Sequence, residues 1–305
     1  MKLTFIVNPR AGRGSMERKL DKVLRASGLE YAIRLTERPK HAVELARAAA
    51  AESDVVVAVG GDGTVHEVAS GLIAAGGKAG LAIIAAGTGN DFGKMFDVPA
   101  DLASAVRAIS TSPLTKVDHG RIWWSGSDGG GSAVFMNVAG AGIDAKVAAA
   151  ASGFKLLTGT PRYVAAVLAT LKDWTAPPVE VELWDAGRLI ETIRSEILLV
   201  GAGNGRCAAG GFYLTPDASI TDGKLDALVV RSASVLRILA LIPSVLRGKH
   251  VGQPEVTIEK VDKIVVRPST QVAIEADGEV MTHVAEEITF EVVAGGLSVR
   301  MPVKT

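Results

Sequence analysis

The chain has 305 residues, about the length of two ordinary domains at roughly 150 residues each. A composition of 48% hydrophobic and 22% charged residues excludes a mainly disordered chain. Basic and acidic residues number 33 each, so the net charge of zero gives no general attraction to nucleic acid. Aromatic residues make up only 5%, which leaves few surfaces for stacking bases. We therefore expect no nucleic-acid partner.

Cysteine usage and apolar runs bear on the cellular compartment. Cys207 is the one cysteine of the sequence, which excludes an intramolecular disulfide and favours a reducing environment. The first residues, MKLTFIVNPRAG, contain a short predicted strand in place of the longer apolar stretch of a secretory signal. No run of about 18 apolar residues occurs. The sequence thus predicts a cytoplasmic protein and leaves peripheral contact with a membrane surface open.

The first 120 residues alternate between strand-like and helix-like segments. Apolar strands are predicted at Leu3–Val7, Tyr31–Leu35, Asp54–Val59 and Leu81–Ala85, and helices at Met16–Ser27, His41–Ala51, Thr64–Ala75 and Leu102–Ile109. Continuous apolar strands that alternate with helices indicate a parallel sheet covered on both faces. We therefore predict an α/β domain over residues 1–120.

The pattern changes near Val117–Arg121, where we place the domain boundary. Two helices are predicted beyond it, Tyr163–Leu171 and Leu236–Leu246, and the glycine- and serine-rich segment Ser125–Ser132 is predicted to be a surface loop. Strand candidates follow one another at Ala133–Val138, Val179–Trp184, Leu189–Val200, Leu225–Val230, Glu255–Glu259, Lys263–Arg267, Val272–Ala276 and Glu287–Val293. These features predict a mostly antiparallel, β-rich domain over residues 121–295. The C-terminal tail, 296–305, is a candidate to return to the first domain.

A glycine-rich loop, residues 60–64 (GGDGT), follows the third predicted strand. Glycines let the backbone approach phosphate oxygens closely, and the start of the next helix offers free N–H groups to an anion. Residues 64–67 (TVHE) fit a capping box, with Thr64 as the N-cap and Glu67 at the third helical position. An aspartate beside phosphates requires a cation, so Asp62 favours a Mg²⁺-nucleotide over a bare phosphate. A strand-to-helix turn without a ligand is the simpler alternative.

Two further loops share this context. Residues 87–92 (GTGNDF) follow the strand Leu81–Ala85, and residues 8–15 (NPRAGRGS) follow the first strand. In a parallel sheet, the loops at the carboxyl ends of neighbouring strands converge on one ligand site. No P-loop motif GxxxxGK[ST], GxGxxG, GxSxG or HExxH occurs, and the five histidines form no metal-ligand pattern. The three loops therefore predict a nucleotide site of a different class.

The segments NPRAG, GGDGT and GTGND, with the downstream segments described below, resemble the diacylglycerol kinase catalytic family, in particular its soluble bacterial lipid kinases, which are related to sphingosine kinases. The resemblance covers nearly the whole chain. GGDGT alone also occurs in NAD kinases and phosphofructokinases, whereas GGDGT followed one strand later by GTGND is far more specific. The resemblance implies an α/β nucleotide domain and a β-rich lipid-substrate domain with an active-site cleft between them.

The same resemblance implies ATP as the phosphate donor, together with Mg²⁺. Thr36 matches a position that touches nucleotide in relatives, although a threonine at a strand end would by itself mean little. Asp62 is also expected to act in catalysis. The residues expected to contact the nucleotide are Asn8, Thr36, Gly60, Gly61, Asp62, Gly63, Thr64, Val65, His66, Thr88, Asn90 and Asp91.

Residues 275–279 (EADGE) place two carboxylates around a glycine at the end of a predicted strand. A plain β-turn would explain the pattern. A lipid hydroxyl, however, must lose its proton as it attacks phosphorus, and a carboxylate can accept that proton. In the family, the glutamate of this segment is the proton acceptor, which implies Glu279 here. Asp277 would orient the site or act through a metal, and the reverse assignment stays open.

Residues 216–226 (PDASITDGKLD) are similar to a family segment that holds a structural Mg²⁺. The resemblance implies Asp222 as a side-chain ligand and Ser219 and Lys224 as backbone ligands, a set of hard oxygen donors that suits Mg²⁺. An ordinary Asp-Gly hairpin turn is the alternative. Upstream, residues 201–204 and 209–211 resemble the GN…GGG of the family, with Ala209 in place of a glycine.

Together these features predict a Mg²⁺-dependent, ATP-using lipid kinase that phosphorylates a hydroxyl of diacylglycerol or a similar lipid at a membrane surface. An NAD kinase-like phosphotransferase is the first alternative. A non-catalytic nucleotide- or lipid-binding regulator is the second, and the acidic residues at 62, 91, 222, 277 and 279 disfavour it. Val235–Leu246 is expected to be a core-facing helix broken at Pro243, with an interfacial helix as the alternative. Arg237, Arg247, Lys249 and the apolar residues between them are candidates for membrane contact. Homodimer formation stays open.

Overall fold

The computed structural model describes residues 1–151, 153–154, 156–157 and 160–301. The chain divides into two compact units, which we call unit 1 (Met1–Val117 with Gly295–Thr305) and unit 2 (Asp118–Ala294). Leu297, Val299 and Met301 are buried in unit 1, so the described part of the C-terminal tail belongs to that unit. The last four residues of the predicted tail, 302–305, lie outside the described residues.

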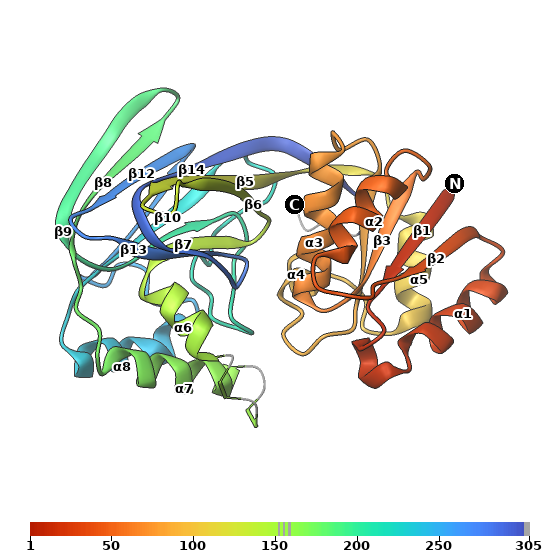
Figure 1. Ribbon diagram of the computed structural model, residues 1–305, viewed down its shortest axis with the longest axis horizontal. Coiled ribbons are helices and arrows are strands. Elements are labelled where there is room, and N and C mark those ends of the chain that lie inside the picture. The colour runs from red at the N-terminus through yellow and green to blue at the C-terminus, as the bar shows by residue number, and fades with distance from the viewer. Residues whose placement is uncertain (152, 155, 158–159, 302–305) are drawn as a thin grey trace. The chain divides into compact units, whose positions relative to one another are not determined.

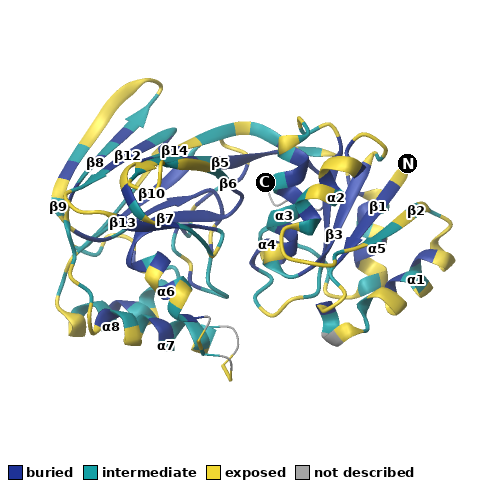
Figure 2. Ribbon diagram, viewed as in Figure 1, coloured by how far each residue is buried: buried dark blue, intermediate teal, exposed yellow. Residues whose placement is uncertain are grey.

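Unit 1 is built on a sheet whose strands pair in parallel in the order β2 (Glu30–Leu35), β1 (Lys2–Val7), β3 (Val55–Gly60) and β4 (Gly80–Ala85). The end of β14 (Glu279–Val299) joins the free edge of β4, with Val299 opposite Leu81. β1, β3 and β4 are buried along almost their whole length, as Figure 2 shows for β1 and β3. This burial on both faces explains why these three segments are continuous apolar runs.

Helices cover both faces of this sheet (Figure 1). α2 (His41–Ala49) packs with α3 (Asp62–Ala74) on one face, and α1 (Met16–Ser27) packs with α5 (Leu102–Thr111) on the other. A Cβ atom on Gly71 would lie 2.4 Å from the Val43 carbonyl oxygen, so α2 and α3 meet backbone to backbone. Two short helices, η1 (Ala11–Gly14) and α4 (Asp91–Met95), follow β1 and β4.

The predicted capping box at residues 64–67 is wrong. α3 begins at Asp62 with Gly61 as its N-cap, so Thr64 lies inside the first turn. The Glu67 carboxylate instead accepts the backbone N–H groups of Lys40 (3.0 Å) and Ala42 (3.1 Å). Glu67 therefore caps the start of α2, the neighbouring helix. The local pattern was compatible with both roles, and the packing of the two helices decides between them.

Unit 2 is rich in antiparallel strands. Neighbouring strands pair around a closed path from β9 through β7, β13, β14, β12 and β8 back to β9. β10 and β11 extend from β9, and β5 and β6 from β14. The bounds are β5 (Thr115–Gly126), β6 (Gly131–Phe135), β7 (Val138–Gly142), β8 (Pro178–Asp185), β9 (Arg188–Gly203), β10 (Leu225–Arg231), β11 (Val256–Val261), β12 (Lys263–Pro268) and β13 (Val272–Ala276). The inward-facing apolar residues form one core, in which Phe135 and Phe290 meet edge to face.

Three helices of unit 2 gather on one side of its strands (Figure 1). α6 (Ile143–Ala151), α7 (Thr160–Leu171) and α8 (Val235–Val245) share a second apolar cluster with β9. The prediction that Pro243 breaks α8 is wrong, because the helix continues through it to Val245. Leu236 at its start is 81% exposed. Within the described ranges, every helix is too short or too polar to cross a bilayer.

Several boundaries differ from the prediction near the start of unit 2. The predicted strand Ala133–Val138 is two strands, β6 and β7, interrupted at residues 136–137. β5 runs through the predicted domain boundary, and Asp118, His119 and Gly120 in its interior have low strand propensity. The predicted loop Ser125–Ser132 shrinks to residues 127–130. The short helix α4 and the alanine-rich α6 were not predicted.

Candidate active site

Three loops meet at the carboxyl edge of the unit 1 sheet. The Asn8 side-chain N–H after β1 donates to the Thr64 hydroxyl at 3.3 Å. The Gly12 N–H donates to the Ala86 carbonyl at 3.2 Å, and the Ala86 N–H donates to the Gly60 carbonyl at 2.8 Å. The loops after β1, β3 and β4 are thus joined to one another, as expected of loops that leave neighbouring parallel strands.

Glycine is required where two of these loops touch. A Cβ atom on Gly87 would lie 2.5 Å from the Cα atom of Gly61, a contact with the backbone that would force the two loops apart. Within the GGDGT loop, a Cβ atom on Gly60 would lie 2.4 Å from the Thr64 hydroxyl oxygen. The predicted phosphate loops therefore need glycine for their own packing, whether or not a ligand approaches them.

Asp62 links the two glycine loops. It stands in the first turn of α3, and its Oδ1 atom accepts the N–H of Phe92 at 3.1 Å, at the start of α4. Burial raises the pKa of Asp62, and the nearby charge of Asp91 adds to the rise. Asp91 is itself buried and forms an ion pair with Lys94 at 2.8 Å. Two acidic side chains thus lie at the junction of the loops.

Other residues predicted to contact the nucleotide close a loop, join neighbouring strands, lie in the core or are exposed. The Asn90 side chain closes its own loop, since it accepts the Gly87 N–H at 2.9 Å and donates to the Gly87 carbonyl at 3.0 Å. Thr88 is exposed at the tip of this loop. Val65 is only 2% exposed, so its side chain belongs to the core. Thr36, directly after β2, donates its N–H to the Val7 carbonyl at 3.0 Å.

In unit 2, Asp277 is held by the backbone of the β6–β7 junction. Its carboxylate accepts the N–H groups of Met136 (2.8 Å), Asn137 (2.9 Å) and Val138 (3.2 Å). Asp277 and Gly278 have φ values of 50° and 86° and join β13 to β14 as a two-residue hairpin turn. Glu279 is the first residue of β14 and is half-buried. The carboxylate of Asp277 therefore orients the turn that carries Glu279.

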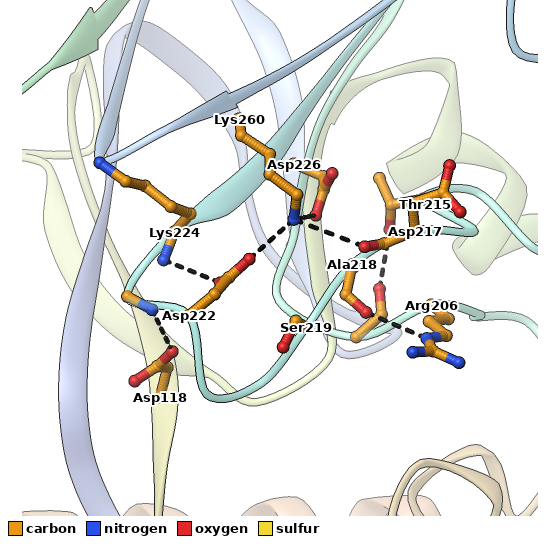
Figure 3. Close-up of polar contacts among 12 residues, drawn as sticks. Asp118, Arg206, Thr215, Asp217, Ala218, Ser219, Asp222, Lys224, Asp226 and Lys260 are labelled. Atoms are coloured by element: carbon orange, nitrogen blue, oxygen red, sulfur yellow. Dashed lines mark hydrogen bonds and ion pairs between the residues drawn. The ribbon is translucent and has the colours of Figure 1, made fainter. Parts of the chain in front are cut away.

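Asp222 lies in a cluster of oxygen atoms around the ammonium group of Lys260 (Figure 3). One Asp222 oxygen accepts the Lys224 N–H at 3.1 Å and the other lies 2.8 Å from Lys260 Nζ. Lys260 Nζ also lies 3.3 Å from an Asp226 oxygen and 3.4 Å from the Asp217 carbonyl. Within the described ranges, no three Asp, Glu, His or Cys side chains gather as metal ligands. Of the other two predicted ligands, the Ser219 hydroxyl lies 3.4 Å from that of Thr221, and Lys224 directs its ammonium group to Asp185.

Two different family models match the two parts of the chain. Residues 2–122 match the diacylglycerol kinase catalytic domain, and residues 137–301 match the YegS C-terminal NAD kinase beta sandwich-like domain. A diacylglycerol kinase from Staphylococcus saprophyticus subsp. saprophyticus is 31% identical over 280 residues, which cover 90% of this chain and 88% of that protein. The chain belongs to the diacylglycerol kinase family.

Solved structures agree with this membership. A provisionally assigned diacylglycerol kinase from Bacillus anthracis str. Sterne has a TM-score of 0.76 and 25% identity, with 98% of this chain and 96% of that chain covered. Yeast NADH kinase has a TM-score of 0.56 at 13% identity and shares the fold alone. The predicted resemblance and the order of an α/β domain and a β-rich domain are confirmed. As a member of the diacylglycerol kinase family, the chain is an ATP-dependent lipid kinase.

Two buried asparagines of this diacylglycerol kinase family member were not singled out from the sequence. The Asn204 side chain donates to the carbonyls of Met136 (2.6 Å) and Asp118 (3.1 Å), and that of Asn137 donates to the Cys207 carbonyl at 2.6 Å. They fasten the β6–β7 junction to which Asp277 binds. Residues 201–204, which include Asn204, resemble a family segment, whereas nothing in the local sequence marks Asn137.

The opposite edge of the unit 1 sheet holds a cavity of about 810 Å³. It is lined by residues before β1 and β3 and by Lys78 before β4, so it lies at the amino ends of the strands. Parallel α/β sheets bind their ligands at the carboxyl ends of the strands. This cavity is therefore separate from the three loops that join at the carboxyl edge.

Proposed function

We propose that the chain transfers the γ-phosphoryl group of Mg²⁺-ATP to a hydroxyl group of diacylglycerol or a closely related lipid. The observation that carries this proposal is the joining of the GGDGT and GTGND loops, through the Gly61–Gly87 contact and the Asp62–Phe92 hydrogen bond. GGDGT followed by GTGND favours a lipid kinase over the other families that share GGDGT. The named substrate of the Staphylococcus saprophyticus relative supports diacylglycerol as the acceptor.

The nucleotide is assigned to unit 1. The helix starts and glycine loops at the carboxyl edge of its sheet offer backbone N–H groups to phosphate oxygens. Asp62 and Asp91 supply hard oxygen ligands for the Mg²⁺ that accompanies ATP. Because burial raises the pKa of Asp62, a bound cation would stabilise its charged form, so the residues fit the ion. When bound, Mg²⁺ neutralises charge on the phosphates.

The proton acceptor is assigned to unit 2. Three backbone N–H groups occupy the carboxylate of Asp277, which favours an orienting role for Asp277 and proton acceptance by Glu279. In the proposed step, the lipid oxygen forms a bond to the γ-phosphorus as the bond from phosphorus to the ADP oxygen breaks. The hydroxyl proton passes to the Glu279 carboxylate.

A structural Mg²⁺ at the Asp222 turn remains a prediction. The oxygen atoms of Asp222, Asp226 and Asp217 form a donor set that suits a cation, and they surround the ammonium group of Lys260. Two of these three are carboxylate oxygens, the kind of hard donor that Mg²⁺ prefers, and their contact with Lys260 shows that this turn attracts a cation. We propose that Asp222 and the backbone of Ser219 and Lys224 hold this ion. The bound ion would stabilise the turn.

Reversible contact with a membrane surface is also proposed, to give access to the lipid. Arg237 has to be removed from the predicted basic patch, because its guanidinium group bonds to Glu255 and Gln253. Arg247 and Lys249, beyond the end of α8, are exposed. Exposed apolar side chains on and near α7 and α8 accompany them, namely Leu156, Leu157, Leu168, Val235 and Leu236. A short apolar surface with a few cations gives weak, salt-sensitive attachment.

The phosphoryl acceptor can be identified with γ-labelled ATP and a panel of diacylglycerol, monoacylglycerol, sphingosine and NAD. We expect label in phosphatidic acid and its loss in Glu279→Gln. Label in NADP with none in any lipid would establish the NAD kinase alternative. Binding of ATP without phosphoryl transfer to any acceptor would establish the alternative of a non-catalytic, nucleotide-binding regulator.

Membrane contact needs a separate measurement, which is co-sedimentation with vesicles of neutral or anionic phospholipid at low and high salt. We expect binding to anionic vesicles that weakens as salt rises, and a further loss in Leu236→Ser. Vesicle binding that is independent of salt and equal for wild type and Leu236→Ser would contradict the proposed membrane-contact surface.

A further inference from the structure

Glu275 lies behind the turn that carries Glu279. It is the fourth residue of β13 and is only 8% exposed. Its Oε2 atom accepts the N–H of Gly278 at 2.6 Å. The turn is therefore fixed from two sides, since Asp277 binds the β6–β7 junction and Glu275 binds the backbone of the turn itself. Glu275 has no part in the catalytic steps derived above.

A second carboxylate, Asp144 of α6, lies beside Glu275. Glu275 is paired directly with Gly140 across β13 and β7. A Cβ atom on Gly140 would lie 1.6 Å from Asp144 Oδ2, so the Asp144 carboxylate fills the place of the missing side chain. Side chains of directly paired residues project from the same face with Cβ atoms about 4.5–5.5 Å apart. The carboxyl group of Asp144 is therefore a close neighbour of the Glu275 side chain.

The carboxylates of Glu275 and Asp144 are shielded from solvent and have acidic neighbours. Asp144 as a residue is only half-buried, yet its Oδ1 atom is fully buried and has no hydrogen-bond partner among the described residues. The charges that act on Glu275 are those of Asp144 from α6 and Asp277 from its own turn. β7 contributes no titratable side chain, and the residue of β14 paired with Glu275 is Val280. Two buried carboxylates in such a place do not both ionise readily.

We propose that Glu275 and Asp144 share one proton, and that the singly protonated pair holds the Asp277–Gly278 turn so that Glu279 is placed for proton transfer. Glu275 is then a positioning residue, acting through the Gly278 N–H. The positioning role rests on the proposed function of Glu279, whereas the shared proton does not. Loss of the shared proton leaves two negative charges side by side, and their repulsion draws Glu275 away from the turn.

The direction of the pH dependence follows from burial. Burial raises the pKa of Asp144 to about 7, and burial followed by the charge of Asp144 raises the pKa of Glu275 well above its usual range. Between the usual carboxyl pKa of about 4 and a pH of about 7, the folded protein holds more protons than the unfolded chain. The stabilisation is therefore complete at low pH and is lost as the pH rises through about 7.

The shared proton is tested by the melting temperature of wild type, Glu275→Gln and Glu291→Gln between pH 5 and 9. Glutamine can still accept the Gly278 N–H but cannot ionise, and Glu291 is an exposed glutamate on β14 that serves as the matched control. We expect wild type and Glu291→Gln to lose stability with rising pH more steeply than Glu275→Gln. Parallel curves for all three proteins would overturn the shared proton.

The positioning role is tested by lipid kinase kinetics. Glu275→Ala should lower kcat by about 10–100-fold with little change in the KM for ATP, because a misplaced catalytic group costs rates of this order. Glu275→Gln should restore most of that kcat at pH 7 and flatten the alkaline limb of the pH profile. Full activity in Glu275→Ala would overturn the positioning role. Full activity in Glu279→Gln would remove the proposed function of Glu279, while the melting curves would still decide whether the proton is shared.

Discussion

The acidic side chains of the two glycine-containing turns, Asp62 in unit 1 and Asp277 in unit 2, are held in different ways. The Asp277 carboxylate accepts three backbone N–H groups, at 2.8, 2.9 and 3.2 Å. For Asp62, the N–H of Phe92 lies within hydrogen-bond distance at 3.1 Å, and burial raises its pKa. The Asp277 carboxylate therefore binds the backbone of the β6–β7 junction, whereas burial disfavours the charged form of Asp62. One acid thus maintains its turn through backbone hydrogen bonds, while the other is buried at a cost that a bound cation would offset.

Replacement of Asp277 should have the largest effect on stability. Asp277→Ala leaves three N–H groups of the β6–β7 junction without their acceptor, which should lower the free energy of unfolding by at least about 3 kcal/mol. Urea unfolding measures this loss. Asp277→Asn, which keeps one acceptor oxygen, should fall between wild type and alanine. A loss below about 1 kcal/mol in Asp277→Ala would show that the three hydrogen bonds do not maintain the turn.

For Asp62 the comparison predicts separate effects on activity and on stability. Asp62→Asn keeps an oxygen for the Phe92 N–H and removes the buried charge, so the melting temperature should hold while activity falls by about 100-fold or more, the order found for lost electrostatic stabilisation. Asp62→Ala should lose the same activity and, in addition, about 1–3 kcal/mol of stability. Kinase assays and thermal melting on both variants provide the measurements. Near-normal turnover in Asp62→Asn would show that the charge of Asp62 has no part in the mechanism.

The contact between the glycine loops can be tested at Gly87. In Gly87→Ala the new methyl group would meet the Cα of Gly61 at 2.5 Å, which should cost about 1–3 kcal/mol and raise the KM for ATP. Gly63→Ala is the matched control for stability, since a Cβ atom at Gly63 meets nothing within 4 Å. Unfolding curves and ATP titrations compare the two. Equal stability of Gly87→Ala and Gly63→Ala would show that the loops separate without cost.

The smallest effect is expected at the Asp222 turn. The Asp222–Lys260 pair is 31% and 44% exposed, so its loss in Asp222→Asn should cost less than about 1 kcal/mol in the absence of metal. If Mg²⁺ binds there, it adds stability that depends on its concentration. Chelation should then lower the melting temperature of wild type more than that of Asp222→Asn. Equal responses of the two proteins to the chelator would argue against a metal at this turn.

The order of elements and the location of the loops could be predicted from the sequence. Buried parallel strands are continuous apolar runs, and the glycine-rich segments directly after β3 and β4 mark the points where backbone must approach backbone. These properties arise from residues that are neighbours in the chain. For the same reason the sequence could assign the chain to its family and give the order of the α/β and β-rich domains, which the comparisons confirm.

Contacts between residues distant in the chain were decided only by the tertiary structure. Glu67 caps a helix whose N-cap residue, Lys40, lies 27 residues earlier, and Asp277 binds a backbone 140 residues away. Asp144 lies beside Glu275 because two strands and a helix place both carboxyl groups over Gly140. A local pattern shows which hydrogen bonds or charges a side chain can offer. Which group receives them depends on how the strands and helices pack, because a carboxylate binds whichever donor the fold places within about 3 Å.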